Sequence, residues 1–70
     1  MPYTTKQRRA ILQCLEDRAS DALTPGEVAE ELRRAGSPVG LATVYRQLEQ
    51  LESAGLLHRI QTGEGALYQY

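Results

Sequence analysis

The segment from Gly40 to Gly55 constrains the fold of this chain more than any other part of the sequence. Its apolar residues recur at spacings of three and four, which is typical of the buried stripe of an amphipathic helix. The stripe consists of Leu41, Val44, Leu48 and Leu51. Gly40 can begin this helix, and Gly55 can end it because glycine readily adopts the left-handed conformation of a helix cap. The sequence therefore predicts a helix over about residues 41–54 that packs on a small core.

The face of this helix opposite the stripe carries small and hydrogen-bonding side chains. They are Ala42, Thr43, Arg46, Glu49, Gln50 and Ser53, while Tyr45 and Gln47 fall on opposite flanks. A helix that reads DNA needs small residues where it approaches the backbone and donors where it meets bases and phosphates. An ordinary surface helix has a similar pattern. This segment alone therefore leaves both interpretations open.

Upstream, a first helix is predicted to begin at Thr4 or Thr5, with Thr4 and Gln7 at capping-box spacing, and to fade near Arg18. Its inner face consists of Ile11, Leu12 and Leu15, helped by the stem of Arg8. Cys14 has no cysteine partner in the chain, so an internal disulfide is excluded. We expect a small, partly buried apolar residue there, not a reactive thiol.

The sequence predicts that a second helix begins at Thr24-Pro25-Gly26-Glu27. Thr24 is the predicted cap, Pro25 is a first-turn proline, and Glu27 is placed to return the hydrogen bond. The inward residues are predicted to be Val28, Ala29, Leu32 and Ala35. Gly36 and the following Ser37-Pro38 end the helix. The link to the third helix is short, which gives helix-turn-helix spacing, with a short β-bridge expected at Val39.

After Gly55 the periodicity changes to that of strands. Residues 56–62 read as a strand with Leu56 and Ile60 on one face and Arg59 on the other. Residues 62–65 form a glycine-rich turn, and residues 66–70 form the returning strand. Three helices followed by a two-stranded β-hairpin make an α+β winged helix-turn-helix, with the turn as the tip of the wing.

Composition limits the function. With one histidine and one cysteine, the chain has no recognisable metal cluster and no supply of groups for a multi-residue catalytic site, so we expect neither a metal site nor an enzyme. It lacks an apolar run long enough for a membrane helix and an apolar signal region, which predicts a cytoplasmic protein. The net charge of −1 counts against nucleic-acid binding unless the basic residues share one face.

The residues described so far resemble those of the ferric uptake regulator family. The resemblance rests on Gly40-Leu41-Ala42-Thr43-Val44-Tyr45-Arg46, followed by Leu48 and Ala54-Gly55-Leu56. It extends upstream through Thr5, Arg8, Ile11, Leu12, Leu15, Leu23-Thr24, Glu27 and Leu32, and downstream to Gly65 and Tyr68. It covers nearly the whole chain, and the run from Ala42 to Arg46 is its most specific part.

The resemblance implies a sequence-specific, double-stranded DNA-binding domain of a bacterial repressor that responds to metal or peroxide. Helix 41–54 would enter the major groove, and the wing would touch the backbone or the minor groove. The DNA-binding side chains expected on this basis are Thr43, Tyr45, Arg46, Gln47, Gln50, Lys6, Arg8, Arg9 and Arg59. Two copies, as a homodimer, are expected on a palindromic site. The alternative is a winged-helix module that binds a protein partner, which the acidic side chains of Glu27, Glu30 and Glu31 favour.

The chain departs from the family pattern in its metal chemistry. Residues 1–70 are expected to form a single domain without the dimerisation domain that follows the wing in family members and carries their metal sites. Positions that serve such members as metal ligands are filled here by Asp21 or Ala22 and by Gln69. Iron, zinc or manganese is therefore expected only through that further domain, and no cofactor is expected in this chain.

Overall fold

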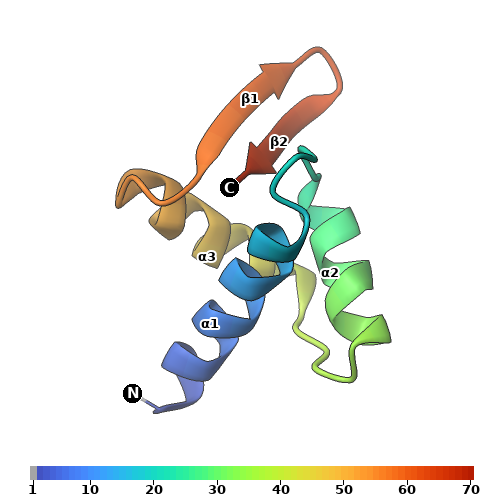
Figure 1. Cartoon of the computed structure of the whole chain (residues 1–70), viewed down its shortest axis with the longest axis vertical. Helices are drawn as coiled ribbons and strands as arrows, with labels where there is room; N and C mark the ends of the chain where they lie inside the picture. The colour runs from blue at the N-terminus through green and yellow to red at the C-terminus, as the bar shows by residue number, and fades with distance from the viewer. Residues whose placement is uncertain (1) are drawn as a thin grey trace.

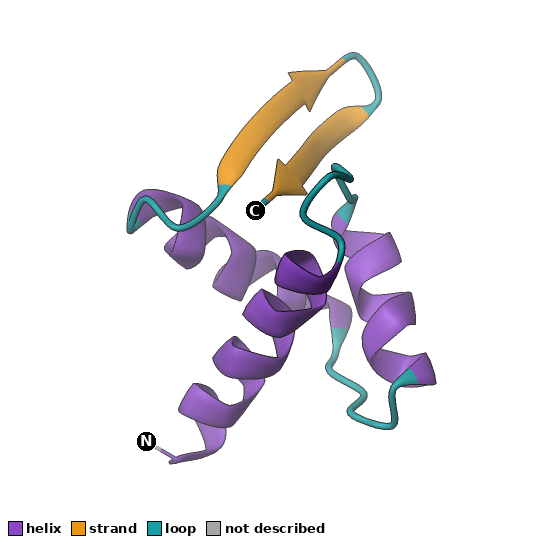
Figure 2. Ribbon diagram, viewed as in Figure 1, coloured by secondary structure: helices purple, strands orange, loops and turns teal. Residues whose placement is uncertain are grey.

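The computed structural model describes the backbone of residues 2–70 and the side chains of residues 6–70. It contains three helices and then one hairpin (Figure 1): α1 (Pro2–Asp17), α2 (Pro25–Arg34), α3 (Leu41–Ser53), β1 (His58–Thr62) and β2 (Gly65–Gln69). The hairpin lies at one end of the three packed helices (Figure 2). The fold is the predicted α+β winged helix. None of the described helices is both long and apolar enough to cross a lipid bilayer.

One hydrophobic core joins the three helices and β2. It is formed by Ile11, Leu15, Leu23, Val28, Leu32, Val44, Leu48, Leu51, Leu57 and Tyr68. The three helices contribute their apolar stripes, the segment directly before β1 contributes Leu57, and β2 contributes Tyr68. An isolated hairpin is marginally stable in water, so these two side chains hold the wing to the helices.

The start of α2 matches the prediction closely. The Thr24 Oγ1 atom accepts a hydrogen bond from the Glu27 backbone N–H at 3.0 Å, and the Glu27 carboxylate accepts one from the Thr24 N–H at 2.9 Å. Pro25 follows the cap as predicted and is buried. This capping box satisfies two backbone donors that the helix itself leaves unpaired. The prediction that Ala35 faces inward is wrong, because Ala35 lies past the last turn of α2 and is exposed.

α1 differs from the prediction at its beginning. The helix starts at Pro2, so Thr4 and Thr5 lie within it rather than at its cap. The proposed capping interaction of Thr4 falls outside the described side chains. At the other end, the Arg18 guanidinium contacts Asp21 at 3.1 Å and Glu31 at 2.9 Å, which ties the end of α1 to α2.

Cys14 lies half-buried against the core, as expected. Burial and the nearby Glu31 carboxylate raise the pKa of its thiol, so less thiolate forms at neutral pH.

The wing pairs in an antiparallel register that joins Arg59 to Tyr68 and Ile60 to Leu67. Leu23 adds an isolated bridge to Tyr68, with N···O distances of 2.8 Å in both directions, so the expected bridge at Val39 is wrong. Leu57 is the buried residue, whereas Leu56 and Ile60 are exposed. The inner face of the wing is therefore the one that carries Arg59 and Tyr68.

Candidate nucleic-acid interface

α3 is presented by the turn that follows α2. Gly36 adopts a φ of 82°, which favours glycine, and ends α2. Gly40 then caps α3 without any side-chain hydrogen bond, and Gly55 adopts a φ of 81° after its last turn. Val44, Leu48 and Leu51 are fully buried, whereas Leu41 is 49% exposed because it lies in the first turn, beyond the reach of the core. The helix is thus anchored along one side and free along the other.

The free side of α3 carries four of the nine residues predicted to contact DNA. Tyr45 is 48% exposed, Arg46 and Gln50 are exposed, and Thr43 is half-buried. Thr43, Arg46 and Gln50 follow at spacings of three and four, so they form one strip, with Tyr45 beside it. A hydroxyl, a guanidinium and an amide therefore point outward from one helix.

Gln47 does not belong to this strip. Its side chain is 3% exposed, and its Oε1 atom is buried without a hydrogen-bond partner. The expectation that Gln47 reaches base edges is wrong, because packing against α1 and α2 encloses a wider part of α3 than its apolar stripe. The exposed strip of α3 therefore carries one of the two predicted amides, that of Gln50.

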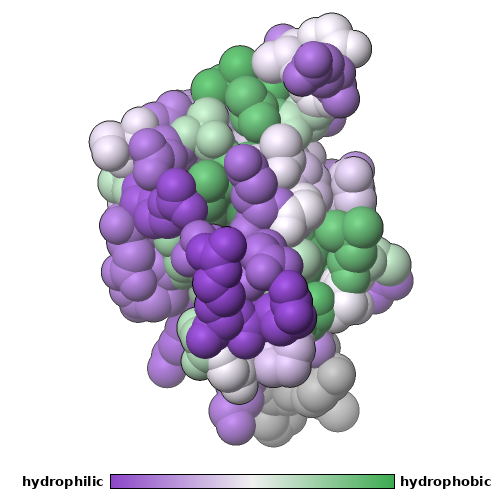
Figure 3. All heavy atoms as spheres, turned by 90° about the vertical axis from the view of Figure 1, so that its right-hand side faces the viewer, coloured by the Kyte–Doolittle hydropathy of each residue, from purple (hydrophilic) through white to green (hydrophobic). Residues whose placement is uncertain are grey.

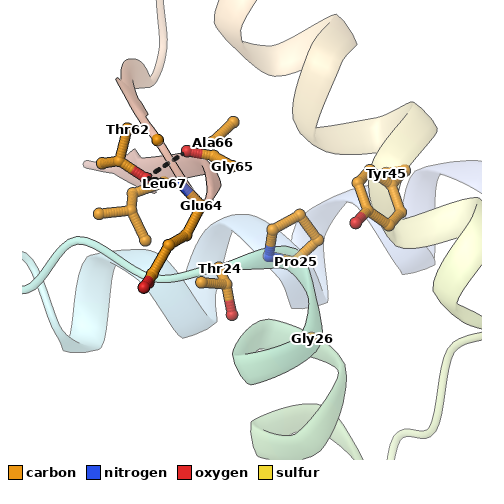
Figure 4. Close-up of a pocket in the computed structure, with 10 residues that line it drawn as sticks. Thr24, Pro25, Gly26, Tyr45, Thr62, Glu64, Gly65, Ala66 and Leu67 are labelled. Atoms are coloured by element: carbon orange, nitrogen blue, oxygen red, sulfur yellow. Dashed lines mark hydrogen bonds between the residues drawn. The ribbon is translucent and has the colours of Figure 1, made fainter.

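A groove separates α3 from the wing. This wing groove, as we call it, has a volume of about 550 Å³ and is lined by residues 24–26 at the start of α2, by Tyr45 and by residues 62–67 of the wing. Figure 4 shows Tyr45 on one side of Pro25, with the turn of the wing on the other side. The first turn of α2 and the wing turn were not among the predicted contacts. These two segments come together through tertiary packing, and no local pattern in the sequence indicates that they do.

The basic side chains that are predicted to contact DNA lie in separate places on the molecule. Arg46 and Gln50 border a shallow hollow along α3 together with Glu49. Lys6 lines another hollow with residues 37–39, directly before the N-cap of α3. Arg59 is on the inner face of the wing. Arg9 is exposed and Arg8 is half-buried.

Ion pairing divides the basic residues into two groups. On α2, Arg33 contacts Glu30 at 2.6 Å and Arg34 contacts Glu31 at 3.2 Å. The hydrogen bond and the charge of Arg33 lower the pKa of Glu30. Figure 3 shows the side of the molecule on which α2 lies, with a broad hydrophilic area. The acidic face of α2 consists of Glu27, Glu30 and Glu31. The charges of Glu30 and Glu31 are therefore neutralised by Arg33 and Arg34 of the same helix and by Arg18.

The remaining basic side chains are those predicted to contact DNA. They are Lys6, Arg8, Arg9, Arg46 and Arg59, and none of them forms an ion pair within residues 6–70. The net charge of −1 therefore does not reveal these five basic side chains, which we call uncommitted because they form no ion pair within residues 6–70.

The described residues do not form a metal centre. No group of three His, Cys, Asp or Glu side chains gathers within them. Asp21, a position of interest from the family pattern, is held by Arg18, and His58 is exposed on β1. These donors do not fit a metal sensor.

Comparison with known proteins identifies relatives along nearly the whole chain. The profile of the ferric uptake regulator family matches residues 3–70. The zinc uptake regulation protein of Mycobacterium tuberculosis is 42% identical over 62 residues, which are 89% of this chain and 47% of that protein. The ferric uptake regulation protein of Legionella pneumophila is 46% identical over 55 residues, which are 79% of this chain and 40% of that protein.

Solved structures agree with this result. The crystal structure of FurB, a zinc uptake regulator from M. tuberculosis, superposes with a TM-score of 0.89 at 40% identity, over 96% of this chain and 52% of that one. The iron-containing ferric uptake regulator of Francisella tularensis gives a TM-score of 0.81 at 40% identity, over 89% and 48% of the two chains. The present chain spans about half the length of these relatives.

Proposed function

Because the chain belongs to the ferric uptake regulator family, we propose that it is the part of a bacterial transcriptional repressor that binds double-stranded DNA in a sequence-specific manner. α3 acts as the recognition helix in the major groove, and the wing lies along the adjacent backbone or minor groove. The observation that carries this proposal is the strip on α3. Thr43, Arg46 and Gln50 point away from the core beside Tyr45, on a helix whose opposite side is buried.

Each side chain of the strip has a chemical role suited to DNA. Arg46 donates to guanine acceptors or to a phosphate, and Gln50 pairs with adenine edges. The ring of Tyr45 packs on thymine methyl groups, and Thr43 near the helix start donates to a phosphate.

The unpaired cations on α1, α3 and the wing supply the sequence-independent part of the affinity. Lys6 lies near the start of α3, and Arg59 lies on the wing face that is turned toward the helices. Arg8 and Arg9 extend this positive region along α1. Contacts from these groups to phosphates position the domain without reading the sequence.

A single domain makes few base contacts, so we propose that two copies bind a palindromic site. Glu49 lies beside Arg46 and reduces the affinity of each copy further. The named relatives are regulators of zinc and iron uptake. We assign no metal-sensing role to the side chains of residues 6–70, since no three His, Cys, Asp or Glu donors gather among them.

The acidic face of α2 gave the alternative of a protein-binding module its main support. Glu30 and Glu31 are engaged by Arg18, Arg33 and Arg34, and Glu27 accepts a hydrogen bond from the backbone at the cap of α2, so this face offers less free negative charge to a basic partner than its sequence suggests. DNA binding is therefore the function that the charge distribution favours.

The proposal is tested with a fluorescently labelled library of short duplexes at low salt, followed by anisotropy on the selected sequence. Arg46→Ala is expected to weaken binding by about 1–3 kcal/mol, equivalent to roughly 5- to 150-fold. Arg33→Ala removes the same charge from the ion-paired side of α2 and is expected to leave the affinity nearly unchanged. Absence of binding at low salt, or equal losses in both variants, contradicts the proposal.

A further inference from the structure

The turn of the wing carries a carboxylate where a wing that grips DNA needs a cation. Thr62, Gly63, Glu64 and Gly65 connect the two strands. The Thr62 hydroxyl donates to the Gly65 carbonyl at 2.7 Å, and the Glu64 N–H donates to the Thr62 oxygen at 3.2 Å. These bonds fix the backbone at Glu64, while its side chain is exposed.

The charge of Glu64 is not neutralised within the described part of the chain. None of the ion pairs among residues 6–70 involves Glu64. By contrast, Glu27, Glu30 and Glu31 are held by the cap of α2 or by arginines. Glu64 therefore presents a carboxylate at the wing tip that none of these ion pairs neutralises.

This charge lies in the wing groove that Tyr45 also lines. In Figure 4 the side chain of Glu64 extends from the turn on the side of Thr24, while Tyr45 lies beyond Pro25. On the proposed function, a DNA strand that follows α3 toward the wing would bring phosphates to this groove. Those phosphates would meet the carboxylate of Glu64, which lines the groove together with the first turn of α2, where the helix dipole places a partial positive charge.

We propose that Glu64 limits the affinity of this domain for DNA by repelling the backbone from the wing groove, so that tight binding depends on base contacts from α3. The inference rests on the proposed DNA-binding function. It assigns to the wing a role in specificity, since weakening the sequence-independent contacts raises the share of the affinity that comes from reading bases.

The experiment measures duplex binding by anisotropy for Glu64→Gln and Glu64→Lys at several salt concentrations. Glu64→Gln is expected to bind about three- to tenfold more tightly at low salt, with a gain that shrinks as salt screens the charge. Glu64→Lys is expected to gain more, and both variants are expected to bind a non-cognate duplex better. Neither substitution touches a hydrogen bond of the turn, because those bonds involve the backbone of Glu64 and the Thr62 hydroxyl.

The matched control is Asp17→Asn, which removes one negative charge at the end of α1. Asp17 is exposed and borders a different hollow, together with Cys14 and Glu31. Its effect is expected to stay below twofold. Equal gains in Glu64→Gln and Asp17→Asn, or no gain in Glu64→Gln while Arg46→Ala still weakens binding, overturn the role of Glu64 alone. If neither the parent chain nor any Glu64 variant binds DNA, the proposed function fails as well.

Discussion

The side chain of Gln47 is buried, although the sequence places it on the flank of the apolar stripe of α3. Gln47 lies between Val44 and Leu48 in the chain and is almost fully enclosed, yet its Oε1 atom has no hydrogen-bond partner. A buried acceptor without a partner costs free energy, because its hydrogen bonds to water are lost and not replaced.

We expect Gln47→Leu to stabilise the domain by about 1 kcal/mol, since it removes the unpaired amide and keeps a side chain of similar size. For a domain of this size that gain raises the melting temperature by about 4–8 °C. Thermal unfolding followed by circular dichroism measures the change. Gln50→Leu on the exposed strip is the control and is expected to shift the melting temperature by much less. A lower melting temperature in Gln47→Leu would show that the amide is satisfied in solution.

Single residues were predictable where local chemistry decides their place. Cys14 and Tyr45 lie as their neighbours in the sequence indicated. Gln47 and Leu41 do not, because the depth of a flank position depends on how closely α1 and α2 approach α3. That approach is a property of the packed core, and no spacing within α3 encodes it.

Among the elements, α2 was the most predictable, and the capping box explains why. Both of its hydrogen bonds join residues three apart, so the sequence alone specifies them. The wing was less predictable. Its turn and pairing were correct, but Leu56 and Leu57 are adjacent apolar residues, and either could begin the inward face. The bridge from Leu23 to Tyr68 settles the choice through a contact that is distant in sequence.

Thr24→Ala is expected to destabilise the domain by about 1 kcal/mol. The substitution removes the acceptor for the Glu27 N–H and one half of the reciprocal pair that starts α2. Urea unfolding monitored by circular dichroism gives the free energy of unfolding for this variant. Ser20→Ala, in the exposed turn after α1, serves as the control and is expected to change stability by less than about 0.5 kcal/mol. Equal effects in the two variants would mean that the cap contributes nothing in solution.

Across the whole molecule, ion pairs divide the basic side chains into a paired group and an unpaired group. The arginines of α2 and Arg18 are committed to carboxylates on one side, and the uncommitted basic side chains belong to α1, α3 and the wing. The count of charges in the sequence could not show this division, because it depends on which side chains the fold brings within reach. The resemblance in residues 40–46 led to the proposed interface, whereas the net charge counted against it.

The division of charge predicts how strongly salt weakens DNA binding. The chain has 8 Lys and Arg residues, and Arg18, Arg33 and Arg34 are paired, which leaves five side chains to displace counterions from DNA. Since each phosphate contact contributes about −0.9 to the slope of log K against log salt, the slope per chain is expected to be no steeper than about −4.5.

Anisotropy titrations over a range of salt concentrations measure this slope. Lys6→Ala is expected to make it shallower by about one, because Lys6 is one of the uncommitted cations near α3. The double variant Arg33→Ala, Arg34→Ala is the control and is expected to leave the slope unchanged. A slope near −7 in the parent chain would require nearly all the basic residues to contact phosphate. The ion pairs of α2 would then have to open on DNA, and the two faces of the molecule would not be electrostatically distinct.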